Sequence, residues 1–88
     1  MKANKIYYFT ASWCSACKAM KPNFEKVMSN HPDIPFEYID VESDLGVELS
    51  SQFGIRNLPT LVFLSDEENT HAKESGSNAY KEIEKYLS

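Results

Sequence analysis

The chain has 88 residues, of which 42 % are hydrophobic and 25 % are charged, a mixture typical of one small folded domain and not of a wholly disordered chain. Its net charge of −4 gives no support for general nucleic-acid binding, and no apolar run approaches the ~20 residues that a membrane span needs. We therefore expect a single domain over residues 1–88 with no nucleic-acid or membrane partner.

The first half of the chain alternates between strand and helix patterns. The apolar, aromatic run over 5–10 predicts a buried strand. Residues 15–30 have a helical pattern, and Pro22 within it should kink the helix axis because proline removes one backbone hydrogen bond. The apolar face of this helix would consist of Ala16, Met20, Phe24 and Val27 with Met28. After the helix, a second strand is expected over 35–40.

A second, shorter helix follows this strand. Ser43 or Asp44 can cap its start, and Gly54 suits its end. Three apolar residues at helical spacing would face inward, namely Leu45, Leu49 and Phe53.

The rest of the chain predicts a hairpin and a closing helix. Strands are expected over 60–64 and, with a polar edge-strand pattern, over 70–75, with a turn over 66–69. Gly76 ends the second of these strands, and Ser77 or Asn78 then caps the last helix. Its inward residues would be Tyr80, Ile83 and Leu87.

This order, β-α-β-α-β-β-α, predicts an α/β fold with a four-stranded mixed sheet flanked by three helices. The first two strands should be parallel because a helix connects them, whereas the last two should form an antiparallel hairpin. The helices should cover both faces of the sheet.

The chain has only two cysteines, Cys14 and Cys17, which lie between the first predicted strand and the first helix. A bridge across two residues constrains the unfolded chain little, so a chemical role is favoured. Unpaired amides and the dipole of a helix start stabilise a thiolate, so the pKa of Cys14 should fall below the ~8.5 of a free thiol. Cys17 lies one turn further in and should be more buried. We expect Cys14 to attack a disulfide and Cys17 to resolve the mixed disulfide.

The same pair could instead be half of a zinc site. Zinc usually takes four ligands, and the remaining candidates are His31 and His71, both in polar segments. We expect both histidines to be solvated surface residues and no metal to be bound.

Two segments of the sequence resemble the thioredoxin family. Residues 9–18, FTASWCSACK, look like the family's active-site segment around Trp-Cys-Gly-Pro-Cys-Lys, and residues 53–60, FGIRNLPT, are close to its Tyr-Gly-Ile-Arg-Gly-Ile-Pro-Thr. Pro22 and Gly76 also stand where the family has a helix-kinking proline and a glycine before the last helix. The likeness covers nearly the whole chain and implies a minimal thioredoxin fold and reduction of protein disulfides by dithiol exchange.

By this resemblance Pro59 is a cis-proline that faces the cysteines. A cis-proline makes a tight turn, and Leu58 before it can offer its backbone to an extended substrate as an added strand. Without the resemblance, a trans-proline that starts a strand would be the simpler interpretation. The substrate-binding residues that follow from the resemblance and the position of the cysteines are Trp13, Ser15, Ala16, Leu58 and Pro59, with Trp13 as an apolar platform.

The sequence departs from the family pattern in three places. The usual first strand and helix are missing, which leaves a glutaredoxin-sized domain. Ser15 and Ala16 replace Gly-Pro, which implies a couple more oxidising than the about −270 mV of thioredoxin. Tyr8 stands where thioredoxins bury an aspartate, and a phenol with a pKa near ~10 is no base at neutral pH. The group that deprotonates Cys17 is therefore open between water, the leaving thiolate and another carboxylate.

The resemblance implies no bound cofactor. Reducing equivalents would come from NADPH through a thioredoxin-reductase-like flavoprotein, and the substrates would be disulfide-containing proteins, of which ribonucleotide reductase is typical for the family. The apolar run over 6–9 is too short for a signal-peptide core, so we expect a cytoplasmic protein, acting as a monomer.

Two other functions stay open. A glutaredoxin would use glutathione, and the helix start at 76–78 could hold one of its carboxylates, although Trp13 and the segment over 53–60 are thioredoxin-like features. A non-catalytic binding module would dock the fold onto a partner or share a metal cluster between two chains. Insulin reduction, a glutathione-coupled assay and an absorption spectrum distinguish the three.

Overall fold

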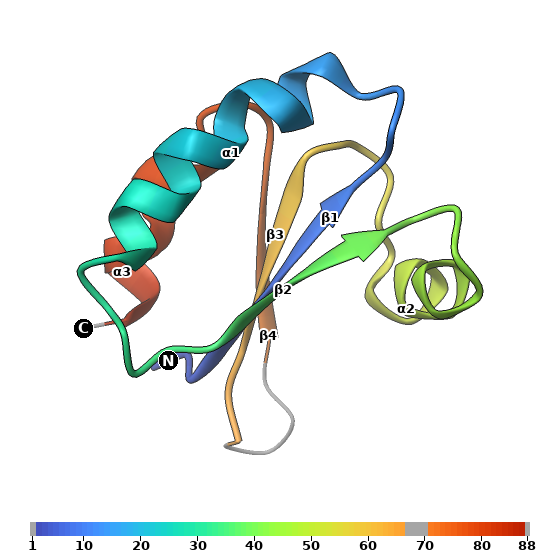
Figure 1. Ribbon diagram of the computed structural model, residues 1–88. Helices are drawn as coiled ribbons and strands as arrows, with labels where there is room; N and C mark the ends of the chain where they lie inside the picture. Colours follow the sequence, from blue (N-terminus) through green and yellow to red (C-terminus); the bar gives the residue numbers. More distant parts are fainter. Residues whose placement is uncertain (1, 67–70, 88) are drawn as a thin grey trace.

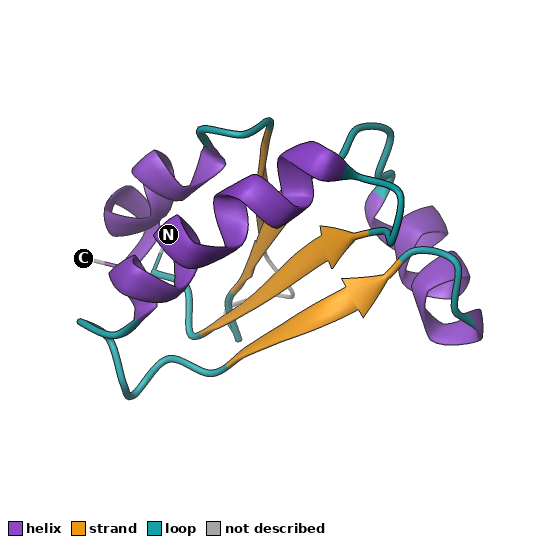
Figure 2. Ribbon diagram, turned by 45° about the horizontal axis from the view of Figure 1, so that its top comes forward, coloured by secondary structure: helices purple, strands orange, loops and turns teal. Residues whose placement is uncertain are grey.

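The computed structural model describes residues 2–66 and 71–87 and is built on one central sheet. β1 pairs with β2 in parallel and with β3 in antiparallel orientation, and β3 pairs with β4 in antiparallel orientation. The predicted mixed sheet, with an edge strand near the C-terminus, is therefore confirmed. The strands are β1 (Lys5–Thr10), β2 (Phe36–Asp40), β3 (Thr60–Leu64) and β4 (His71–Ser75), in the spatial order β2-β1-β3-β4 (Figure 1, Figure 2).

Helices cover both faces of this sheet, as predicted. α1 (Ser15–Met28) and α3 (Ile83–Leu87) lie on one face, and α2 (Asp44–Phe53) lies on the other (Figure 1). Successive side chains of a strand point to opposite faces, so Tyr8 packs in the core beneath α1 whereas Phe9 packs in the core beneath α2. Within residues 2–66 and 71–87, no helix is long and apolar enough to cross a bilayer.

α1 carries the larger part of the core. It continues through Pro22, and its buried side chains are Cys17, Met20, Phe24 and Met28. The helix ends at Met28, two residues before the predicted end, where the Asn30 and His31 backbone amides donate to the Val27 and Met28 carbonyls in a turn.

α2 begins and ends at the predicted residues. The Gly46 amide donates to Ser43 Oγ over 2.9 Å, and Gly54 ends the helix in the left-handed conformation with φ +64°. The prediction that Leu45 faces inward is wrong, because its side chain is 56 % exposed. Gly46 is the residue that faces β2: a Cβ on it would lie 1.7 Å from the Asp40 carbonyl oxygen. The close approach at Gly46 turns the neighbouring Leu45 outward.

The C-terminal segment differs from the predicted single helix. It starts with a 3-10 turn, η2 (Ala79–Glu82), which continues into α3. The prediction of a side-chain cap is wrong, since Asn78 precedes the turn without making a capping hydrogen bond. Gly76 ends β4 with φ +100°, as predicted. Of the predicted hairpin, residues 67–70 lie outside the described residues.

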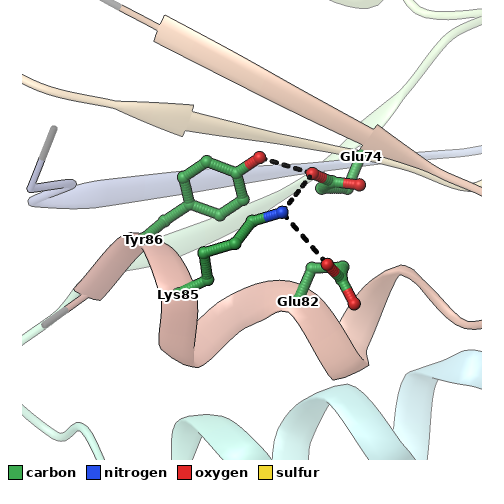
Figure 3. Close-up of polar contacts among 4 residues, drawn as sticks. All are labelled: Glu74, Glu82, Lys85 and Tyr86. Atoms are coloured by element: carbon green, nitrogen blue, oxygen red, sulfur yellow. Dashed lines mark hydrogen bonds and ion pairs between the residues drawn. The ribbon is translucent and has the colours of Figure 1, made fainter.

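Polar contacts hold α3 on the sheet. The Tyr86 hydroxyl donates to Glu74 on β4, and Lys85 Nζ lies 3.4 Å from Glu74 Oε2 and 3.1 Å from Glu82 Oε1 (Figure 3). The Tyr86 ring also stacks on Phe63 with 4.3 Å between ring centroids. Exposed ion pairs contribute little each, so the stacked ring and the buried side chains of Ile83 and Leu87 are the main anchors of α3.

Candidate active site

The turn from β1 into α1 brings the two cysteines together. Cys14 is the N-cap of α1 with extended backbone angles, Cys17 lies in its first turn, and the two form a disulfide with 5.3 Å between their Cα atoms. The Cys17 amide donates a hydrogen bond to Cys14 Sγ over 3.2 Å. As predicted, Cys17 is the more buried of the pair, with 1 % of its surface exposed against 6 % for Cys14.

This helix start favours negative charge on Cys14. The Cys17 amide already points at Cys14 Sγ, and charge-assisted hydrogen bonds are stronger than neutral ones. The first turn of α1 has no acidic residue that would oppose the positive end of the helix dipole. The arrangement suits a thiolate at Cys14 in the reduced protein.

Tyr8 lies directly beneath the resolving position. Its hydroxyl donates to the Cys17 backbone carbonyl over 2.6 Å, and its ring packs edge-to-face with Phe24 and Tyr38. Burial, and to a smaller extent the charge of Glu25, raise the pKa of Tyr8 to about 12. At neutral pH Tyr8 is therefore a protonated hydrogen-bond donor and no base.

The segment before β3 forms the other side of the site. The Leu58–Pro59 peptide bond is cis, as the resemblance implied. Pro59 is fully buried, its carbonyl accepts the Gly76 amide over 2.9 Å, and Thr60 Oγ1 donates to the Asn57 carbonyl over 2.6 Å. These bonds fix the loop that carries Leu58.

A groove of about 550 Å³ runs beside Cys14. Of the predicted substrate-binding residues, Trp13 and Leu58 line it, and Trp13 is 67 % exposed and so free to touch a partner. The other three do not line it: Ser15 is exposed, Ala16 is half-buried against the core, and Pro59 is buried.

Sequence reasoning missed three residues that line this groove, namely Val41 after β2 and Val47 and Ser50 of α2. Ile55 and Arg56, which also line it, belong to the 53–60 segment that resembles the thioredoxin family. Ser50 Oγ is buried without a hydrogen-bond partner among the described residues. Val41, Val47 and Ser50 are far from the cysteines in the chain, and no pattern in the sequence pointed to a place beside Cys14.

The two histidines lie apart from the groove. His31 Nε2 is 2.8 Å from Glu84 Oε1 and is less solvated than predicted, whereas His71 is exposed beside the Phe53 ring. In the part of the chain that the structure describes, no three His, Cys, Asp or Glu side chains are grouped closely enough to hold a metal ion.

Comparison with known proteins identifies the family. The family model described as Thioredoxin matches residues 2–88. This chain belongs to the thioredoxin family. Thioredoxin of Ophiophagus hannah is 34 % identical over 82 residues, which cover 90 % of this chain and 75 % of that protein. Thioredoxin of Mycoplasmoides gallisepticum is 41 % identical over 58 residues, covering 66 % and 56 % of the two chains.

Solved structures agree with this assignment. Oxidised mitochondrial thioredoxin 3 from Saccharomyces cerevisiae superposes with a TM-score of 0.80 at 25 % identity, over 98 % of this chain and 78 % of that one. Family membership and the bonded Cys14–Cys17 pair at a helix start together make this protein a thiol–disulfide oxidoreductase, a protein-disulfide reductase of the thioredoxin type.

Proposed function

We propose that this protein-disulfide reductase receives electrons from NADPH through a thioredoxin-reductase-like flavoprotein and passes them to disulfides in extended segments of other proteins. The observation that carries the proposal is the groove beside Cys14, which is lined by the exposed apolar side chains of Trp13 and Val47. An open groove with apolar walls fits a peptide chain, whose side chains alternate across it, better than a small charged thiol.

The reaction proceeds in two exchanges. The Cys14 thiolate attacks a substrate disulfide, forms a mixed disulfide and releases the first substrate thiolate. The Cys17 thiolate then attacks Cys14 Sγ, so that the Cys14–Cys17 bond forms, the bond from Cys14 to the substrate breaks, and the second substrate thiolate leaves. Trp13 provides the apolar platform, and the backbone of Leu58 pairs with the substrate as an added strand.

Two features argue for a flavoprotein reductant over glutathione. Arg56 is the only basic residue among the described residues that line the groove, whereas glutathione carries two carboxylates. The segment over 76–78, which could have held one of them, leads into a four-residue 3-10 turn whose first amide, that of Ala79, already donates to the Gly76 carbonyl over 3.0 Å.

We place the protein in the cytoplasm as a monomer without a bound cofactor. Its substrates are protein disulfides of the kind found in ribonucleotide reductase.

The test compares two electron sources. Oxidised protein is mixed with NADPH and the cognate thioredoxin reductase, or with NADPH, glutathione and glutathione reductase, and insulin is the acceptor in both mixtures. We expect fast NADPH consumption and insulin reduction in the first mixture, and neither with the Cys14→Ser variant. Fast consumption in the second mixture alone would assign the protein to the glutathione-dependent reductases.

A further inference from the structure

We propose that Asp40 accepts the proton that Cys17 loses before it resolves the mixed disulfide. The proposal rests on the two-step exchange described above and supplies the base that its second step needs. It is carried by a second cavity, of about 310 Å³, that is separate from the substrate groove and is lined by both Cys17 and Asp40.

The fold holds Asp40 in the lining of this cavity. Asp40 is the last residue of β2 and lies in register with Thr10, the last residue of β1 before the active-site turn. Its Oδ1 accepts the Glu42 amide over 2.9 Å, which fixes the carboxylate, and the residue is exposed, so a captured proton can pass to solvent. Cys17 also lines the cavity but is almost fully buried, with 1 % of its surface exposed.

The other titratable groups of the cavity cannot take this proton. The Tyr8 hydroxyl is committed as a donor to the Cys17 carbonyl, and the Tyr38 hydroxyl donates to Glu25 on α1. Burial is the largest cause that raises the pKa of both phenols, which keeps them protonated. Lys18 and Lys21 also line the cavity, but an ammonium group has no acceptor site. Among the described residues that line it, Asp40 is the only carboxylate.

The step balances without any further reactant. The proton on Cys17 Sγ moves to the Asp40 carboxylate, directly or through solvent admitted by the cavity. The resulting Cys17 thiolate attacks Cys14 Sγ and the substrate leaves as a thiolate, after which Asp40 returns its proton to solvent. The two ammonium groups of α1, of which Lys21 Nζ lies 4.7 Å from the centre of the Tyr38 ring, stabilise the transient thiolate.

The charge of Asp40 also makes the test directional. A fixed negative charge near Cys17 disfavours the Cys17 thiolate, so removing the charge of Asp40 would by itself speed resolution of the mixed disulfide. Removing a proton acceptor would instead slow this resolution. The two roles therefore predict opposite changes for the same variant.

Asp40→Asn is the variant of choice, because its amide oxygen can still accept the Glu42 amide. Asp33→Asn is the matched control, since Asp33 lies in the loop before β2 and does not line the cavity. Reduced protein is mixed in a stopped-flow instrument with dithiobis-nitrobenzoate, which releases one coloured thiolate when Cys14 attacks and a second when Cys17 resolves. The rate of the first phase measures attack by Cys14. The rate of the second phase measures resolution by Cys17, which is the step that needs the proton acceptor.

We expect the second phase of Asp40→Asn to slow about tenfold or more at neutral pH, with the first phase and the control unchanged. The difference in second-phase rate between Asp40→Asn and the wild-type protein should shrink as the pH rises past ~8.5, the ordinary pKa of a thiol, because solvent alone then deprotonates Cys17. Asp40→Glu should restore the second phase, and Asp40→Gln serves as the neutral variant if Asn does not fold. An unchanged or faster second phase would overturn the proposal, whereas loss of the first phase in the wild-type protein would contradict the exchange mechanism instead.

Discussion

The Tyr8 hydroxyl donates a hydrogen bond to the Cys17 carbonyl over 2.6 Å, and this bond joins the centre of β1 to the first turn of α1. Tyr8 thus fills the space beneath the cysteines with a phenol whose proton is already engaged. A hydrogen-bond donor therefore supports the site at the position where the family pattern has an aspartate.

Replacing Tyr8 by Phe should therefore affect stability more than chemistry. The variant removes the hydroxyl's hydrogen bond to the Cys17 carbonyl, so the free energy of unfolding should fall by about 0.5–1.5 kcal/mol. The second phase of the reaction with dithiobis-nitrobenzoate should stay within a few-fold of the wild-type rate. Urea unfolding and stopped-flow absorbance measure the two effects, and a much larger loss of rate in a folded variant would show that the hydroxyl takes part.

The same residue predicts a loss of stability at high pH. The pKa of Tyr8 is raised from 10.0 to about 12 in the folded protein. Between these values the unfolded chain has released the proton that the folded protein still holds, so stability is present below pH 10 and falls as the pH rises toward 12. One such group gives a slope of about 1.4 kcal/mol per pH unit. Unfolding measured across this window should show a shallower slope in Tyr8→Phe, and identical slopes would contradict the assignment.

Substitutions at two exposed residues of α2 should distinguish an effect on substrate binding from an effect on the exchange reaction. Val47 lines the groove and Leu45 does not, although both are similarly exposed, at 59 % and 56 %. Val47→Glu places a charge in the apolar wall and should raise KM for insulin several-fold, whereas Leu45→Glu should leave it unchanged. Neither should alter the first phase with dithiobis-nitrobenzoate. Equal effects on KM would show that the groove is not where the protein substrate lies.

The redox potential should lie above the about −270 mV of thioredoxin. The reason is the Ser15-Ala16 pair, which replaces the family's Gly-Pro between the cysteines. A shift of about 30 mV corresponds to roughly 1.4 kcal/mol in the relative stability of dithiol and disulfide. Titration against a glutathione buffer measures the wild-type protein and the Ser15→Gly/Ala16→Pro double variant. The prediction fails if the wild-type value is at or below that of thioredoxin.

Local signals in the sequence predicted the elements that hold the site. The continuous apolar runs of β1 and β3 gave their bounds to the residue, and Ser43 and Gly54 gave the two ends of α2. Each of these features depends on neighbours within a few positions of the chain. The resemblance to the thioredoxin family, and not a local signal, located Tyr8 beneath the cysteines.

Features set by tertiary contacts were not predicted. The inward face of α2 is decided by Gly46 against the Asp40 carbonyl, which helical spacing alone does not contain, and so Leu45 was misplaced. The groove wall combines residues after β2 with residues of α2, and the cavity beside Cys17 depends on the parallel pairing that sets Asp40 beside Thr10. Contacts between segments this far apart in the chain form only when it folds, so local sequence patterns do not predict them.

The central claim is that Cys14 attacks and Cys17 resolves, and the Cys17→Ser variant tests it most directly. This variant and Cys14→Ser are reduced, incubated with a protein disulfide and analysed by peptide mass spectrometry without reductant. The account predicts a stable mixed disulfide on Cys14 in the Cys17→Ser variant and almost none in the Cys14→Ser variant. Preferential trapping of substrate on Cys17 in the Cys14→Ser variant would contradict it.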